Sequence, residues 1–265
     1  MNRTLSVRFA FLIVLLSVIS ALIIGSLFSA LDPSILSGAK PGLSTYIAMF
    51  VGQGFLIVPI LFFLTRKKLP LAESLRLNPV SREVVFTTIL LSIGAMIISD
   101  EINILVDMII PMPDSFLQVE AMLTPENPLS LFLLIITIVF LAPIGEELLF
   151  RGFLQKKLEE SWQDITRAVL VTSLFFAFIH MNPVWIIQIY LLGVILGYLA
   201  WKTGSILTSL VLHSLNNGAA LILTNYSESI NPYYLWNNHV SPLFLVIAIC
   251  SLSFGFYNLN KLVRE

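Results

Sequence analysis

The sequence has few charged residues, one cysteine and three histidines. Only 12% of its 265 residues are Asp, Glu, Lys or Arg, whereas 57% are hydrophobic. A soluble domain is nearer one quarter charged, so this composition predicts an integral membrane protein. The formal net charge of -1 gives no reason to expect a nucleic acid as partner.

The scarcity of sulfur and nitrogen ligands limits the metal sites that the chain could build. Cys250 is the single cysteine, which excludes an internal disulfide and a cysteine-rich metal site. We expect Cys250 to be a buried small apolar residue. No cofactor is certain from the residues alone.

Long apolar runs make up most of the chain. A helix needs about 20 apolar residues to cross the hydrocarbon core of a bilayer. The predicted fold is therefore an all-α polytopic helix bundle, and residues 1–265 form a single membrane domain. We expect eight spans, at 7–30, 44–64, 84–106, 129–153, 167–182, 184–202, 205–224 and 240–260.

Three of these segments need comment. The first is longer than the 7–15 residues of a signal-peptide core, which favours a membrane span. The third contains Asp100 and Glu101, so we expect it to leave the membrane near Ser99. The fifth is short, and Pro183 is expected to end it. His239 falls in the predicted loop 225–239, where we expect it to be solvated.

The positive charges predict the orientation of the chain. If the N-terminus is cytoplasmic, the eight spans place every Lys and Arg except Lys40 on the cytoplasmic side. Both termini are therefore predicted to be cytoplasmic. We expect the protein to lie in the plasma membrane of a bacterial cell.

Polar residues interrupt three of the predicted spans. An ionisable side chain at the bilayer centre costs roughly 2.5–3.5 kcal/mol on insertion scales, so such residues usually have a function. Glu146, His180, His213 and Asn217 are predicted to lie roughly 14–20 Å from the cytoplasmic interface. They can converge if their helices are neighbours.

Helical spacing separates two roles on the fourth span. Glu147 and Arg151 are four residues apart and can pair, and Arg151 is close enough to the interface to extend toward it. Glu146 points about 100° away and is left without a partner on its own helix. Pro143 removes one backbone hydrogen bond, so we expect an opening of the helix at the carbonyl of Val139.

Two glycines on the sixth span are predicted to serve packing. Gly193 and Gly197 form a small-residue motif with a spacing of four. Such motifs usually allow two helices to approach closely.

The four converging residues suit the hydrolysis of an amide bond. A carboxylate such as Glu146 can take a proton from water, and a histidine can help to hold that water. His and Asn donors can stabilise an oxyanion. Alternatively, Glu146, His180 and His213 form the ligand set of a catalytic zinc site, although no HExxH motif is present. A non-enzymatic membrane protein and an ion-coupled transporter that uses Glu146 as proton carrier are further alternatives.

Three motifs resemble one known family. PIGEELLFR at 143–151 fits an EExxxR motif, FAFIH at 176–180 fits FxxxH, and HSLNN at 213–217 fits HxxxN. In this order they are similar to the CPBP intramembrane proteases, which include the CaaX prenyl endopeptidases and the bacteriocin-processing or Abi-type proteins. The resemblance covers about residues 129–222, the expected catalytic core.

The resemblance implies an intramembrane endopeptidase that cleaves membrane-associated peptides or proteins near the cytoplasmic side. It assigns activation of water to Glu146 and His180, and the oxyanion hole to His213 and Asn217. Glu147 and Arg151 are expected to support the site. The implied partners are the lipid bilayer and a peptide or protein substrate. A non-enzymatic immunity or scaffold protein of the same fold, and a zinc-dependent protease, stay open as alternatives.

Overall fold

The computed structural model describes residues 5–32, 40–110 and 122–263. Arg3 and Arg264, which belong to the predicted charge asymmetry, lie outside these ranges. Within the described residues the chain forms the following helices and strands: α1 (Val7–Ser29), α3 (Leu43–Arg66), α4 (Leu71–Ser74), α5 (Arg82–Ile109), α7 (Pro128–Ile135), η2 (Ile136–Leu141), α8 (Ala142–Glu147), η3 (Leu148–Gln155), α9 (Lys156–Trp162), α10 (Ile165–Ile179), α11 (Ile186–Thr203), α12 (Ile206–Tyr234), β1 (Leu235–Trp236), β2 (His239–Val240) and α13 (Pro242–Leu262).

Seven helical segments in the described residues are long and apolar enough to cross a membrane. One of them runs without a break from α7 to α9, over Pro128–Trp162. The prediction of an all-α polytopic membrane bundle is therefore confirmed. A small addition is the antiparallel pair of β1 and β2.

The expected fifth span is shorter than predicted. Helix α10 has 15 residues, which gives a length of about 22 Å, less than the roughly 30 Å of a hydrocarbon core. It ends at Ile179, and Asn182 then accepts hydrogen bonds from the backbone N–H groups of Val184 and Trp185. This turn stops the helix before Pro183 is reached.

Several helices begin at side-chain caps that the sequence supplies. A serine, asparagine or aspartate oxygen accepts a backbone N–H of the first turn, which satisfies a donor that has no partner in the helix. These caps are Ser6, Ser81, Asn127, Asp164 and Ser205. Helix α11 ends at Gly204, which has φ +63°, a conformation that favours glycine.

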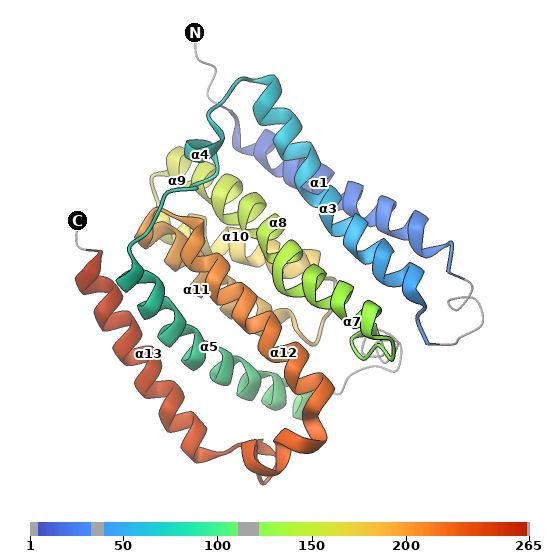
Figure 1. Ribbon diagram of the computed structural model, residues 1–265. Coiled ribbons are helices and arrows are strands. Elements are labelled where there is room, and N and C mark those ends of the chain that lie inside the picture. Colours follow the sequence, from blue (N-terminus) through green and yellow to red (C-terminus); the bar gives the residue numbers. More distant parts are fainter. Residues whose placement is uncertain (1–4, 33–39, 111–121, 264–265) are drawn as a thin grey trace.

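The bundle has a central group of helices between two outer pairs (Figure 1). Helices α1 and α3 pack side by side along one edge, and α5 and α13 along the other. The segment α7–α9 and helices α10, α11 and α12 lie between them. The start of α1 and the end of α13 lie at the same end of the bundle as α4 and α9.

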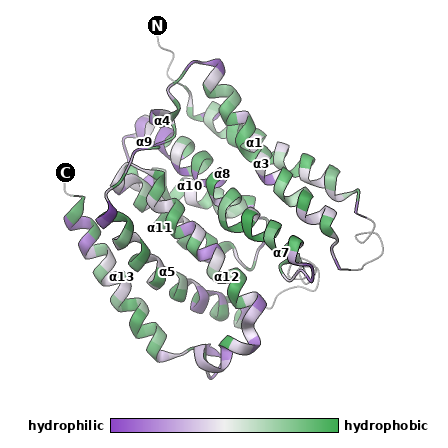
Figure 2. Ribbon diagram, viewed as in Figure 1, coloured by the Kyte–Doolittle hydropathy of each residue, from purple (hydrophilic) through white to green (hydrophobic). Residues whose placement is uncertain are grey.

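Hydropathy follows this arrangement. The helices are mainly hydrophobic along their length, and hydrophilic stretches gather around α4 and α9 and beyond the far end of α12 (Figure 2). Many large apolar side chains are exposed on the outside of the bundle, among them Leu27, Phe62 and Phe254. Outward-facing apolar surface of this kind is expected where lipid replaces water.

The prediction of a loop over 225–239 is wrong. Most of this segment is helix, because α12 continues through a kink at Tyr226 to Tyr234. Helix α5 continues past Ser99 to Ile109, and its exit from the membrane near Ser99 stays a prediction. Polar contacts join the two helices and the hairpin: Asp100 forms a hydrogen bond with Tyr234, and Glu101 accepts hydrogen bonds from His239 Nδ1 and Val240 N, each at 2.8 Å. The carboxylates and His239 thus have partners inside the fold.

The expectation that Cys250 is buried is also wrong. Its side chain is exposed on α13. Helix α13 lies at the edge of the bundle, where α5 is its main packing partner. An apolar residue on its outer face therefore faces outward, away from the other helices.

Candidate active site

The helix that carries Glu146 changes its hydrogen-bond register on both sides of the site. The short α-helix α8 lies between the π-helical segments η2 and η3. In η2 the N–H of Ala142 donates to the carbonyl of Thr137, five residues earlier. π-Helical turns of this kind are often found at functional sites.

In this register each N–H donates to the carbonyl five residues earlier. Pro143 has no N–H, so the carbonyl of Ile138, five residues before it, receives no backbone hydrogen bond from that position. Asn217 Nδ2 donates to the carbonyl oxygen of Ile138 at 3.0 Å. The expected opening named the carbonyl of Val139, on the assumption of an α-helical register; the carbonyl that Asn217 bonds is that of Ile138, one residue earlier.

Glu147 and Arg151 form the predicted ion pair. Arg151 Nη1 lies 2.9 Å from Glu147 Oε1, and neither side chain is exposed. Arg151 Nη2 also donates to the carbonyl of Gly193 at 3.2 Å, and its guanidinium lies 4.2 Å from the ring centre of Phe176. The expectation that Arg151 extends toward the interface is wrong, because these partners hold it in the interior.

His213 joins this pair to Glu146. Its Nδ1 lies 3.0 Å from Glu147 Oε1, and its Nε2 lies 3.7 Å from Glu146 Oε2. An ionised carboxylate can only accept hydrogen bonds, and Glu147 already accepts one from Arg151. The nitrogen of His213 that faces it, Nδ1, therefore carries the proton. In the neutral ring Nε2 then carries a lone pair toward Glu146.

His180 approaches the same carboxylate from another helix. It caps the C-terminus of α10, and its Nδ1 donates to the carbonyl of Phe176 at 2.7 Å. Its Nε2 lies 3.9 Å from Glu146 Oε2. The premature end of α10 thus places His180 at the site. Both separations from Glu146 exceed a direct hydrogen bond, and a bridging water fits such spacings.

Phe176 is the shared packing surface of the site. Its ring lies edge to face with His180 at 4.8 Å and with His213 at 5.8 Å between centroids. With 1% exposure it is fully buried below both imidazoles. The spacing of four between Phe176 and His180 predicts that both side chains share one helical face, although it assigns no role to Phe176.

The structure brings most of the predicted residues together. Glu146, His180 and His213 face one another, and Glu147 and Arg151 lie behind His213. Asn217 follows His213 by one helical turn, and one N–H of its amide is used by Ile138. Exposure also divides the set: 12% of the Glu146 side chain and 28% of the His180 side chain are accessible, whereas Glu147 and Arg151 are sealed.

The zinc alternative depends on how the His, Asp and Glu side chains are arranged. In the described residues, no group of three or more His, Cys, Asp or Glu side chains is arranged to hold a metal ion. The three facing atoms of Glu146, His180 and His213 are nevertheless the residue types that zinc prefers.

A comparison with protein families gives one match. Residues 128–219 match the model of a family described as "Type II CAAX prenyl endopeptidase Rce1-like". Over these residues the chain is similar to that family. The resemblance predicted from the three motifs is confirmed, and all six predicted site residues lie inside the matched segment. No curated protein and no solved structure matches the chain.

The matched segment covers the central helices of the bundle. It begins at the first residue of α7 and ends within α12, so it contains α8, α10 and α11. Helices α1, α3, α5 and α13 lie outside it. At the family level this segment indicates an endopeptidase that acts in the membrane.

Proposed function

We propose that this protein is an intramembrane endopeptidase that hydrolyses peptide bonds of membrane-associated peptides or proteins. The observation that carries the proposal is the convergence on Glu146. The Nε2 atoms of His180 and His213 face one carboxylate oxygen at 3.9 and 3.7 Å. The carboxylate oxygen of Glu146 and Nε2 of His180 are two acceptors for the two hydrogen bonds that one bridging water can donate.

Glu146 and His180 are proposed to activate that water. Glu146 takes a proton as the water oxygen attacks the carbonyl carbon of the scissile bond, and His180 Nε2 accepts the second hydrogen bond. The proton on Glu146 is then transferred to the leaving amine nitrogen. The products are a new carboxyl group and a new amine, with no covalent enzyme intermediate.

His213 and Asn217 are proposed to stabilise the oxyanion. For Nε2 of His213 to donate a hydrogen bond, the ring must be cationic, because Nδ1 already donates to Glu147. Glu146, Glu147, Arg151 and a cationic His213 then carry two negative and two positive charges, which favours burial of the group. Asn217 retains a second N–H beside the one used by Ile138.

Exposure supports the direction of approach. Glu146 and His180 are the accessible members of the cluster, so a substrate is proposed to contact these two first. The charged connections around α4 and α9 lie at the end predicted to be cytoplasmic (Figure 2). We place cleavage nearer that side of the bilayer.

The test compares membranes from cells that make the natural protein, Glu146→Gln or His180→Ala. New peptide N-termini in membrane proteins are profiled by mass spectrometry. We expect cleavage products to fall by at least about 100-fold in both variants, the usual contribution of general base catalysis. The matched control is Glu160→Gln, because Glu160 lies on the same helix with a half-exposed carboxylate. Unchanged products in both site variants would refute the protease and favour a non-enzymatic membrane protein.

The zinc-dependent alternative has its own measurement. Purified protein is analysed for bound zinc, and cleavage is followed with and without a chelator. The proposal expects no stoichiometric zinc and no inhibition. Bound zinc that is lost in Glu146→Gln together with activity would instead assign the site to a metalloprotease.

A further inference from the structure

A buried polar column continues from the site beyond the family motif. Four side chains at a spacing of four lie on one face of the helix: Glu147, Arg151, Gln155 and Glu159. Gln155 is fully buried, and its Nε2 donates both to Glu159 Oε1 and to the carbonyl of Gly197, each at 2.9 Å. This repeats the pattern of Arg151, which bonds to Glu147 and to the carbonyl of Gly193.

Gly197 of α11 makes part of this column possible. A Cβ atom on Gly197 would lie 2.8 Å from Gln155 Oε1, closer than any normal contact. Gly197 therefore lets α11 approach until its carbonyl accepts from Gln155, whereas a Cβ atom on Gly193 would lie 3.1 Å from Ser173 Cβ of α10. The predicted packing role of Gly193 and Gly197 includes this polar contact.

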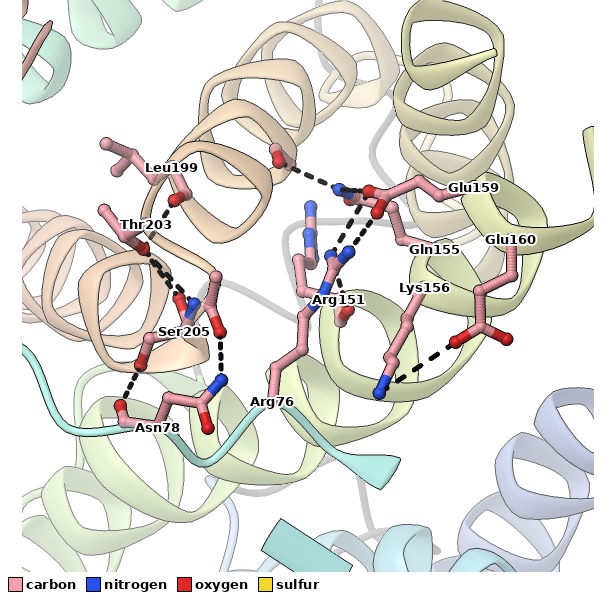
Figure 3. A network of polar contacts seen from close by, with 12 residues as sticks. Arg76, Asn78, Arg151, Gln155, Lys156, Glu159, Glu160, Leu199, Thr203 and Ser205 are labelled. Carbon is pink, nitrogen blue, oxygen red and sulfur yellow. Dashed lines mark hydrogen bonds and ion pairs between the residues drawn. The ribbon is translucent and has the colours of Figure 1, made fainter. Parts of the chain in front are cut away.

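Arg76 closes the column at its far end (Figure 3). It lies in the connection between α4 and α5, distant in sequence from the site. Both of its Nη atoms bond to the carboxylate of Glu159, and Nη1 also donates to the carbonyl of Arg151 at 3.4 Å. Arg76 is 9% exposed, and its backbone has φ +53°, which is uncommon for a residue with a side chain. Such a conformation persists where the surrounding contacts impose it.

The backbone of the same connection is bonded to the start of α12. The carbonyl of Arg76 accepts from the N–H of Ile206 at 3.0 Å, and Asn78 Nδ2 donates to the carbonyl of Gly204 at 2.7 Å. Ser205 Oγ donates to the carbonyl of Asn78 at 2.5 Å. Figure 3 shows Arg76 and Asn78 between the helix of Gln155 and Glu159 and the turn at Ser205.

We infer that Arg76 is a positioning residue that fixes the helix of Glu146 relative to the helix of His213. Its side chain holds η3 and α9, and its backbone holds the first turn of α12, two turns before His213. The inference rests on the proposed function, because the aligned distance is that between Glu146 and His213. A displacement of 1 Å at reacting groups can lower the rate about 100-fold. Arg76 lies outside the matched segment 128–219, so the N-terminal half of the chain completes the site.

The first experiment needs no substrate. The chain has three histidines, so nitrogen NMR spectra of histidine-labelled protein in detergent can be assigned with His180→Gln and His239→Gln variants. We expect Arg76→Gln to shift the Nδ1 resonance of His213, which reports its hydrogen bond to Glu147. Arg82→Gln, at an exposed arginine that begins α5, should leave that resonance unchanged. An unchanged His213 resonance in folded Arg76→Gln overturns the inference.

The second experiment uses a membrane protein whose cleavage depends on Glu146. We expect Arg76→Gln to lower kcat by about 10- to 100-fold while KM stays nearly constant. Arg76→Lys keeps the charge but replaces two donor atoms with one, so it loses the paired contact with both carboxylate oxygens of Glu159. An intermediate kcat is expected, and the fold should persist. Full kcat in Arg76→Lys and Arg76→Gln contradicts the positioning role.

A loss of stability alone must give a different result. Leu91→Ala creates a cavity where α5 packs against α13, and Leu91 is not one of the polar residues of the column. It should lower the melting temperature without lowering kcat at a temperature where the protein is folded. An equal loss of kcat in Leu91→Ala refutes the inference. If Glu146→Gln cleaves normally, the proposed function fails; if only the Arg76 variants cleave normally, the positioning role alone fails.

Discussion

At the scale of single residues, the fully buried pair of Glu147 and Arg151 shows how ionised groups are kept in this bundle. Burial removes both charges from water, at a cost that their attraction offsets only when further hydrogen bonds are made. His213 and the carbonyl of Gly193 supply those bonds. The pair therefore orients the ring of His213 and so contributes to the site without contacting substrate.

Removal of one charge should be more damaging than removal of both. Arg151→Met leaves the carboxylate of Glu147 buried without its cation and should cost about 3–5 kcal/mol of unfolding free energy. The double variant Glu147→Gln/Arg151→Met should lose less. Unfolding in detergent measures both.

The exposed pair of Lys40 and Glu126 provides the control for this prediction. Their side chains are 64% and 74% exposed, and Lys40→Met should cost at most about 1 kcal/mol. A double variant that is no more stable than Arg151→Met would contradict the account of Glu147 as an uncompensated charge.

Helical spacing predicted the local pair and the separation of Glu146 from it, because both depend on positions along one helix. Arg76 and Glu159 could not be paired in this way. They are 83 residues apart, and only the packing of the connection against α9 brings them together. In the sequence, Arg76 is only one of the many Lys and Arg residues predicted to lie on the cytoplasmic side.

At the scale of elements, the π-helical segments around α8 set which backbone groups the site must satisfy. The register of η2 leaves the carbonyl of Ile138 without a donor at Pro143, and Asn217 takes that place. Asn217 is therefore both a structural bridge between η2 and α12 and the proposed oxyanion donor. These two roles can be separated.

Asn217→Ala should leave the Ile138 carbonyl unpaired, at a cost of about 1–3 kcal/mol. Pro143→Ala supplies a backbone N–H in the right register, so Pro143→Ala/Asn217→Ala should recover part of that stability. Cleavage should stay low in both variants, because the oxyanion donor is absent. Unfolding and cleavage are measured on the same preparations. Recovery of cleavage in the double variant would show that Asn217 serves structure alone.

The positions of the helices were largely predictable because apolar runs mark them, whereas the end of α12 was not. The polar segment 225–234 contains Pro232 and was expected to be a loop, yet α12 includes it. Its helix is held by the bond between Tyr234 and Asp100 and by the β-hairpin that packs on Glu101. Contacts of this kind override local propensity.

At the scale of the whole molecule, both described chain ends lie at one end of the bundle (Figure 1). The short helix α10 leaves both chain ends on the same end of the bundle, because α10 and α11 together form one excursion that starts and finishes there. It begins three residues after α9, and α11 ends beside Asn78, so the two helices enter and leave from the same end. Which helices become neighbours could not be predicted, because spacing along the chain carries no information about contacts between spans.

The positive charges predict that this end is cytoplasmic. A reporter fused after Val263 should be active in the cytoplasm, and one inserted after Leu123 should be active only outside. Reporter activity for both positions measures the topology. Two fusions that report the same compartment, or a cytoplasmic signal after Leu123, would contradict the predicted orientation.

The central claim is that Glu146 activates the water that cleaves a membrane substrate. It is tested most directly by N-terminal profiling of membranes containing the natural protein, Glu146→Gln or the control Glu160→Gln at equal abundance. The account predicts products that disappear, by about 100-fold or more, in Glu146→Gln and persist in Glu160→Gln. Equal product levels in all three membranes would contradict it.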